Sequence, residues 1–135
     1  LNTQFKKLLK KKPKICLLGL NPHNSELLDG SEEVKKIKPS VLFLKKKRLV
    51  IEGPFAADSI FIDNYKNYDV VVGMYHDQVL APFKSMFKYD AINLTLGLDY
   101  IRVSPDHGTA TNIIGKNKSN YTSLLQCIKF INNLK

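Results

Sequence analysis

Short, continuous apolar runs alternate with helix-like stretches along this chain, and this alternation restricts the fold more than any other feature. The apolar runs are typical of strands buried on both faces of a sheet, and they lie at residues 15–18, 49–51 and 69–74. The helix-like stretches carry apolar residues every three to four positions, and they lie at residues 1–9, 31–44 and 119–131. We therefore predict an α/β fold with a mostly parallel sheet flanked by helices. Two later strands could add an antiparallel pair, at residues 91–96 and 100–103.

Turn and cap residues mark the ends of these elements. Pro13 ends the first helix, and Gly53-Pro54 closes the strand that precedes it. Ser31 and the pair Ser119-Asn120 are typical N-caps for the two later helices. Pro39 lies inside the middle helix, so we expect a kink or an early break there.

The composition favours one soluble globular domain. The 135 residues are 44% hydrophobic and 24% charged, so we treat residues 1–135 as a single unit. No apolar run approaches the roughly 20 residues that span a bilayer, and the N-terminus has no signal-peptide pattern, so we expect a cytoplasmic protein without membrane partners. Cys16 and Cys127 show no metal-ligand spacing and no disulfide framework, and we predict that both are buried thiols.

The net charge of +9 raises nucleic acid as a partner, but its distribution argues against one. Thirteen of the 21 basic residues lie between Lys6 and Arg48, with few aromatic residues between the lysines to stack on bases. Solvated helix faces therefore explain the charge better. A basic nucleic-acid-binding module remains an alternative, and it predicts binding that weakens steeply with salt.

The chain contains three histidines, and each stands beside a turn or a strand end. His23 follows Asn21-Pro22, His76 follows the strand at 69–74, and His107 precedes a glycine. The carboxyl ends of strands are where open α/β sheets bind ligands. No HExxH-like spacing fixes a metal, so a structural role for each histidine and a metal-dependent hydrolase both remain open on the pattern alone.

Five ordered motifs carry a resemblance to a known family, and they lie at residues 19–23, 53–61, 74–78, 93–102 and 106–110. In this order they resemble the C-terminal part of the 4-hydroxythreonine-4-phosphate dehydrogenases of vitamin B6 biosynthesis. That family has an isocitrate/isopropylmalate dehydrogenase-like fold, which would be incomplete at its N-terminus here. The resemblance implies that residues 1–135 form the metal-binding, substrate-binding and dimerisation region, with the last helix returning toward the cofactor domain.

The resemblance implies a divalent metal, such as zinc, magnesium, cobalt or manganese, at the interface of a homodimer. Three histidines hold it in the family, and His23 and His76 match two of them. The third histidine, and a His-Thr pair that contacts substrate, belong to segments upstream of the match. Because two imidazoles alone would bind a metal weakly, we expect the 135-residue chain to be inactive by itself.

Further residues match the family's substrate site. Lys84, Asn93 and Arg102 match substrate-binding positions, and their chemistry suits an anionic phosphorylated amino acid. On the pattern alone, Lys84 could be a solvated helix lysine, and Arg102 could form a surface ion pair with Asp99 or Asp106.

Two aspartates and one loop complete the expected site. Asp58 and Asp77 match motif positions, and we assign Asp77 as the catalytic residue, through orienting an imidazole or contacting substrate. A simple turn or cap role for either aspartate remains open. His107, Gly108 and Thr109 are similar to the adenosine-side loop of the wider superfamily, which implies NAD or NADP binding without a GxGxxG motif.

The implied reaction is the NAD(P)-dependent oxidation of 4-phosphohydroxy-L-threonine, followed by decarboxylation to 3-amino-2-oxopropyl phosphate. The expected partners are this small phosphorylated substrate and a second copy of the chain, and not nucleic acid or membrane. The residues do not identify the general base.

Overall fold

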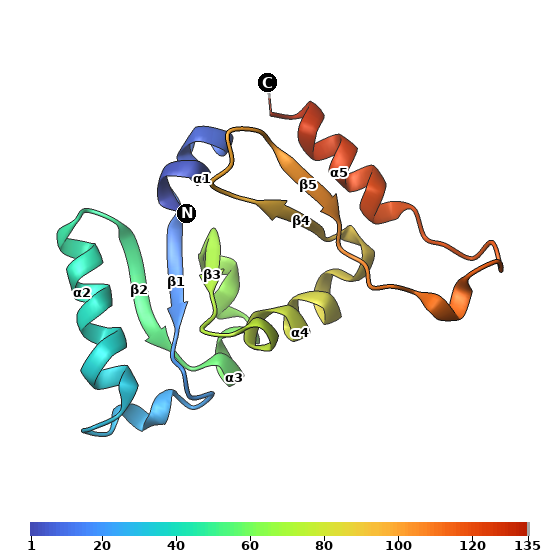
Figure 1. Cartoon of the computed structure of the whole chain (residues 1–135). Helices are drawn as coiled ribbons and strands as arrows, with labels where there is room; N and C mark the ends of the chain where they lie inside the picture. The colour runs from blue at the N-terminus through green and yellow to red at the C-terminus, as the bar shows by residue number, and fades with distance from the viewer. Residues whose placement is uncertain (135) are drawn as a thin grey trace.

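The computed structural model describes residues 1–134, apart from the side chains of residues 25 and 26. Figure 1 shows how the elements are arranged. The α-helices of this part are α1 (Asn2–Leu9), α2 (Lys38–Lys46), α3 (Ala57–Ile60), α4 (His76–Phe87) and α5 (Thr122–Asn132). The strands are β1 (Lys14–Leu18), β2 (Val50–Phe55), β3 (Val70–Val72), β4 (Ile92–Thr95) and β5 (Arg102–Pro105).

The first three strands form a parallel sheet with β1 in the centre, in the order β2-β1-β3. Ile15 of β1 is aligned with Ile51 on one side and with Val70 on the other. The predicted parallel α/β sheet flanked by helices is therefore confirmed. The two later strands pair antiparallel, as expected, but they form a separate sheet, β4-β5, instead of extending the parallel one.

The apolar run of β1 is buried because both faces of the sheet are covered. On one face Ile15 packs with Val41 of α2 and with Ile51 of β2. On the other face Cys16 and Leu18 pack with Ile60 of α3. A central strand with two buried faces needs apolar residues at every position, and this explains the continuous run in the sequence.

The N-cap positions of η2 (Glu33–Ile37) and α5 are Glu32 and Tyr121, one residue after the predicted caps, but the predicted side chains still bond the first helical turn. The Ser31 hydroxyl accepts a hydrogen bond from the Val34 backbone N–H at 3.3 Å, and the Asn120 side chain accepts one from Thr122 N–H at 2.8 Å. The predicted break near Pro39 is also confirmed. η2 is a wide π-helical turn that precedes α2, and Pro39 lies in the first turn of α2. Proline has no N–H to donate and crowds the preceding turn, so the helix changes its pitch there.

Several predicted strand boundaries are wrong. The strand expected at residues 100–103 is β5, at Arg102–Pro105, and the strand expected at residues 69–74 ends already at Val72. The strand at residues 49–51 does not close at Gly53-Pro54 but continues as β2 to Phe55, whose carbonyl accepts a 2.9 Å hydrogen bond from Gly19 N–H. A shift in register between β1 and β2 lets the glycine and proline pass through the strand. Gly53 has a φ of 137°, and a Cβ there would lie 2.3 Å from the Leu17 carbonyl oxygen, so only glycine fits.

The cysteines and lysines behave as the sequence predicted. Cys16 and Cys127 are both buried and free. Burial, together with the nearby Glu52 carboxylate, raises the pKa of the Cys16 thiol to about 12, so this thiol is protonated at neutral pH. The lysines of α1 and α2 lie exposed on the helix surfaces. No helix in the described part of the chain is long and apolar enough to span a membrane.

Candidate metal- and substrate-binding site

His23 and His76 lie at the same edge of the parallel sheet. His23 is in the turn after β1, where its backbone N–H donates to the Asn21 side-chain oxygen at 2.9 Å. His76 is the first residue of α4, shortly after β3 ends at Val72. Because β1 and β3 are parallel neighbours, their carboxyl ends share one edge. The structure thus brings the two predicted ligands to the place where α/β sheets bind ligands.

Each of these imidazoles is paired with a carboxylate. His23 Nδ1 lies 2.7 Å from Asp58 Oδ2, and His76 Nδ1 lies 2.7 Å from Asp77 Oδ1. Both side chains are otherwise open, with exposed fractions of 71% for His23 and 79% for His76. A carboxylate on Nδ1 fixes the tautomer in which that nitrogen carries the proton, and this leaves the Nε2 lone pair for a ligand.

This donor set fits part of a metal site. Neutral imidazole nitrogens backed by carboxylates are the usual ligands and outer partners of zinc and similar divalent cations. Within residues 1–134, however, no group of three or more His, Cys, Asp or Glu side chains is placed to hold an ion. The described residues therefore do not form a complete metal site by themselves.

Buried polar residues hold the His23 turn in place. Glu33 is 1% exposed, and its carboxylate accepts a 2.8 Å hydrogen bond from Asn21 N–H. The Asn24 side chain donates to the Pro54 carbonyl at 3.0 Å, and Asp58 N–H donates to the Pro22 carbonyl at 3.3 Å. The sequence indicated only that Glu33 is an acid in a first helical turn. Its role as a support for the turn is visible only once the helix packs beside β1.

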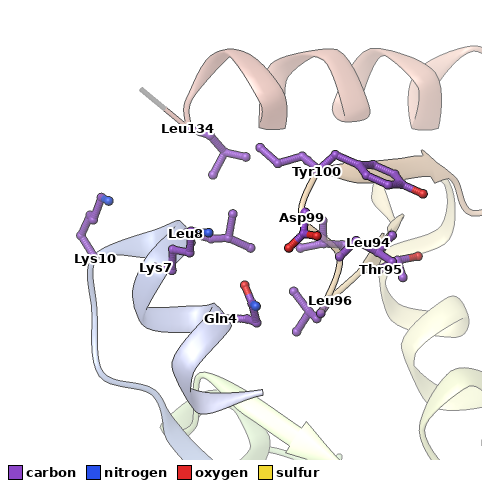
Figure 2. A pocket seen from close by; sticks show the side chains of 13 residues that line it. Gln4, Lys7, Leu8, Lys10, Leu94, Thr95, Leu96, Asp99, Tyr100 and Leu134 are labelled. Atoms are coloured by element: carbon purple, nitrogen blue, oxygen red, sulfur yellow. The ribbon is translucent and has the colours of Figure 1, made fainter.

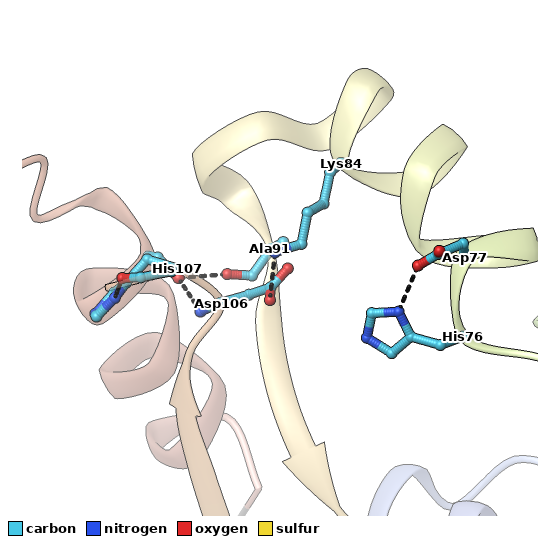
Figure 3. Close-up of polar contacts among 8 residues, drawn as sticks. His76, Asp77, Lys84, Ala91, Asp106 and His107 are labelled. Carbon is cyan, nitrogen blue, oxygen red and sulfur yellow. Dashed lines mark hydrogen bonds and ion pairs between the residues drawn. The ribbon is translucent and has the colours of Figure 1, made fainter. Parts of the chain in front are cut away.

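Lys84 is paired and is not a freely solvated lysine. Its ammonium lies 3.2 Å from Asp106 Oδ1, and its side chain is about half exposed. Asp106 follows β5, and its backbone N–H donates to the Ser123 hydroxyl of α5 at 2.9 Å. That hydroxyl in turn donates to the Ala91 carbonyl at 2.5 Å. Figure 3 shows these contacts linking α4, β4, β5 and α5, with His76 and Asp77 on the same helix as Lys84.

Asn93 and Arg102 lie on one face of the β4-β5 sheet. Arg102 is directly opposite Thr95, and Asn93 is two residues before Thr95, so the three side chains project to the same side. The Arg102 guanidinium donates to the Thr95 hydroxyl at 2.9 Å. The expected surface ion pair of Arg102 with Asp99 or Asp106 is not formed: the guanidinium donates to Thr95, and Asp106 pairs with Lys84.

The loop after β5 is open. His107, Gly108 and Thr109 are exposed, and the His107 ring nitrogen Nδ1 lies 3.0 Å from the Gly108 carbonyl oxygen. A Cβ on Gly108 would meet no atom within 4 Å, so this backbone is accessible to an incoming molecule. Its place beside Asp106 puts the loop next to the Lys84 ion pair.

A cavity of about 300 Å³ lies beside the β4-β5 sheet, and Thr95, the partner of Arg102, is among the residues that line it. Figure 2 shows it between α1, the connection from β4 to β5, and Leu134. Lys7, Lys10 and Asp99 contribute its charged groups. His23, His76, Lys84, Asn93 and Arg102 are not among its lining residues.

The chain matches a known family over almost its whole length. The family described as Pyridoxal phosphate biosynthetic protein PdxA matches residues 1–131. The chain belongs to the PdxA family.

Curated PdxA relatives are similar in sequence. The 4-hydroxythreonine-4-phosphate dehydrogenase of Aquifex aeolicus is 44% identical over 132 residues, which are 97% of this chain and 41% of the relative. The enzyme of the same name from Xanthobacter autotrophicus is 43% identical over 124 residues, covering 90% of this chain and 35% of the relative. The D-threonate 4-phosphate dehydrogenase of Pectobacterium atrosepticum is 43% identical over 114 residues, which are 83% of this chain and 35% of the relative.

Solved PdxA structures share the fold. The 4-hydroxythreonine-4-phosphate dehydrogenase of Klebsiella pneumoniae aligns with a TM-score of 0.78 and 34% identity, covering 98% of this chain and 41% of that one. The 4-hydroxythreonine-4-phosphate dehydrogenase of Burkholderia phymatum aligns with a TM-score of 0.72 and 38% identity, covering 95% of this chain and 40% of that one. This PdxA chain therefore spans about two fifths of the length of its relatives.

Proposed function

We propose that this chain supplies part of the active site of a metal- and NAD(P)-dependent 4-hydroxythreonine-4-phosphate dehydrogenase. The observation that carries the proposal is the pair of carboxylate-backed histidines, His23 and His76, at one edge of the sheet in a PdxA chain. Two such imidazoles, each with Nε2 open, suit a shared divalent cation better than two unrelated surface histidines.

The third metal ligand comes, in this proposal, from outside these residues. No group of three or more potential ligands occurs within residues 1–134, so we propose that the chain by itself binds metal weakly and is inactive. We propose that a homodimer completes the site. When bound, a divalent cation would lower the pKa of the substrate alcohol and stabilise negative charge on its oxygen.

Lys84, Asn93 and Arg102 are proposed to bind the anionic substrate. Only one N–H of the Arg102 guanidinium is used by Thr95, so the other N–H groups can form a two-point contact with a phosphate or carboxylate. The Lys84 ammonium can approach a substrate anion by leaving Asp106 or by sharing itself between the two. Asn93 offers a neutral amide on the same face as Arg102.

The proposed reaction has two steps, a hydride transfer to the cofactor and a decarboxylation. The alcohol carbon of 4-phosphohydroxy-L-threonine gives its hydride to NAD or NADP, and the hydroxyl proton leaves to a base. The resulting β-keto acid loses carbon dioxide, and the adjacent carbon takes up a proton to give 3-amino-2-oxopropyl phosphate. Asp77 contributes by holding His76 in its ligand tautomer, which makes it a positioning residue. His107, Gly108 and Thr109 form an open loop that suits the adenosine side of the cofactor.

D-threonate 4-phosphate is a second candidate substrate. It carries a hydroxyl where 4-phosphohydroxy-L-threonine carries an amine, and a PdxA relative named for it is as similar to this chain as the others are. The phosphate and the oxidised alcohol are common to both molecules. Lys84 and Arg102 would therefore serve either substrate, and discrimination depends on contacts to the amine.

The proposal is tested by measuring the formation of reduced nicotinamide. The assay uses the whole gene product, which means this chain together with any further segments that its gene encodes. We would measure absorbance at 340 nm with each substrate, NAD or NADP, and added zinc, magnesium, manganese or cobalt. We expect metal-dependent reduction that a chelator abolishes, that His76→Ala abolishes, and that the exposed Ser40→Ala variant of α2 retains. Absence of reduced cofactor with both substrates would refute the dehydrogenase. Release of inorganic phosphate in its place would favour the metal-dependent hydrolase.

A further inference from the structure

Gln78 is a buried glutamine whose amide forms two hydrogen bonds to backbone groups. It lies in the first turn of α4 and is 7% exposed. Its Nε2 donates to the Gly19 carbonyl at 2.7 Å, and its Oε1 accepts from Met74 N–H at 2.7 Å. Only one orientation of the amide satisfies both partners, because one partner is an acceptor and the other a donor.

The two partners of Gln78 belong to the two segments that carry the histidines. Gly19 directly follows β1 and begins the turn that holds His23. Met74 lies between the end of β3 and His76. Gln78 and Gly19 are 59 residues apart in sequence. One buried side chain thus joins the His23 segment to the His76 segment.

The packing around Gln78 leaves little room for another arrangement. A Cβ on Gly73 would lie 2.8 Å from Val79 Cγ1 and 3.3 Å from Gln78 Oε1. α4 therefore starts in close contact with the end of β3, and the amide is held between the two strand ends. Buried and satisfied hydrogen bonds of this kind rigidify the groups that they connect.

We infer that Gln78 is a positioning residue that sets the separation and orientation of His23 and His76 through its bonds to Gly19 and Met74. This inference rests on the proposed metal site. The amide can be tested by substitution: an ionised glutamate can accept from Met74 but cannot donate to Gly19, and a methionine of similar length can do neither.

Metal affinity of the whole gene product, measured with Co²⁺, tests the inference without relying on turnover. We would titrate Co²⁺ into the purified protein, follow its visible absorption, and compare wild type with Gln78→Glu and Gln78→Met. His76→Ala serves as the ligand control, and Gln4→Glu makes the same chemical change on α1, at the opposite end of β1. Thermal unfolding of each variant sets a temperature at which all are folded.

We expect Gln78→Glu and Gln78→Met to weaken Co²⁺ binding by about 10- to 100-fold and to change the absorption band. Losses of this size are typical when a residue that orients the metal ligands is replaced. Gln4→Glu should match wild type. If both Gln78 variants unfold at lower temperature but bind Co²⁺ with wild-type affinity and spectrum, Gln78 is only structural and the inference is wrong. If His76→Ala binds Co²⁺ as well as wild type does, the metal site itself is wrong and the inference is overturned with it.

Discussion

The Ser123 hydroxyl offers a sharp test of how the substrate-binding half of the site is held together. Ser123 is 2% exposed on α5, donates to the Ala91 carbonyl and accepts from Asp106 N–H. Asp106 in turn pairs with Lys84. Replacing Ser123 with alanine removes both hydrogen bonds and creates almost no cavity, so the change isolates the hydroxyl.

The expected loss of stability follows from the two backbone groups that lose their hydrogen-bond partner, the Ala91 carbonyl and the Asp106 N–H. The Ala91 carbonyl is buried and Asp106 N–H is partly buried, so water cannot fully replace the hydroxyl. A buried polar group that loses its partner costs about 1–3 kcal/mol. We therefore expect Ser123→Ala to lower the free energy of unfolding by about 2–4 kcal/mol, and to raise the KM for the phosphorylated substrate because Asp106 and Lys84 lose their support.

Denaturant unfolding followed by circular dichroism measures the first effect, and initial rates at 340 nm measure the second. Ser40→Ala is the matched control, because the Ser40 hydroxyl donates to the Lys36 carbonyl at an exposed position of α2. That change should stay within about 0.5 kcal/mol of wild type. A Ser123→Ala protein as stable as Ser40→Ala, with an unchanged KM, would refute the reasoning.

Three further predictions concern the metal ligands, the substrate and the core. Asp58→Asn should weaken metal binding by about 10- to 100-fold in calorimetry, since the His23 imidazole loses its carboxylate; unchanged affinity would remove Asp58 from the site. Arg102→Lys should raise KM more than it lowers kcat, because an ammonium cannot form a two-point contact; a wild-type KM would argue against substrate binding by Arg102. The pKa of the Cys16 thiol rises on folding from its ordinary value of 9.0 to about 12, so unfolded chains lose this proton first as the pH increases. Below pH 9.0 the thiol is protonated in both states, and its effect on the free energy of unfolding is constant. Between pH 9.0 and about pH 12 this thiol should lower the free energy of unfolding by about 1.4 kcal/mol per pH unit. Cys16→Ala should lack this part of the alkaline decline in denaturant unfolding, and an identical pH profile would contradict the assignment.

The amino-acid sequence determined the elements whose signals are local. The continuous apolar run of β1 and the helical stripe of α5 lie where periodicity predicted them, and Pro39 disturbs its helix as expected. The places of His23 and His76 at strand ends also follow from local order, since neighbouring parallel strands present their carboxyl ends at one edge. Their interpretation as metal ligands came from the order of the surrounding motifs.

The tertiary structure decided the contacts between distant segments. Asp58 pairs with His23, Asp106 pairs with Lys84 instead of Arg102, and Gln78 reaches back to Gly19. β2 runs through Gly53-Pro54 because β1 stays paired with it, although the dipeptide by itself is a turn signal. Periodicity and turn residues report only on near neighbours along the chain. Which polar groups meet across the sheet depends on how the helices pack, and that packing is what sets the geometry of the candidate site.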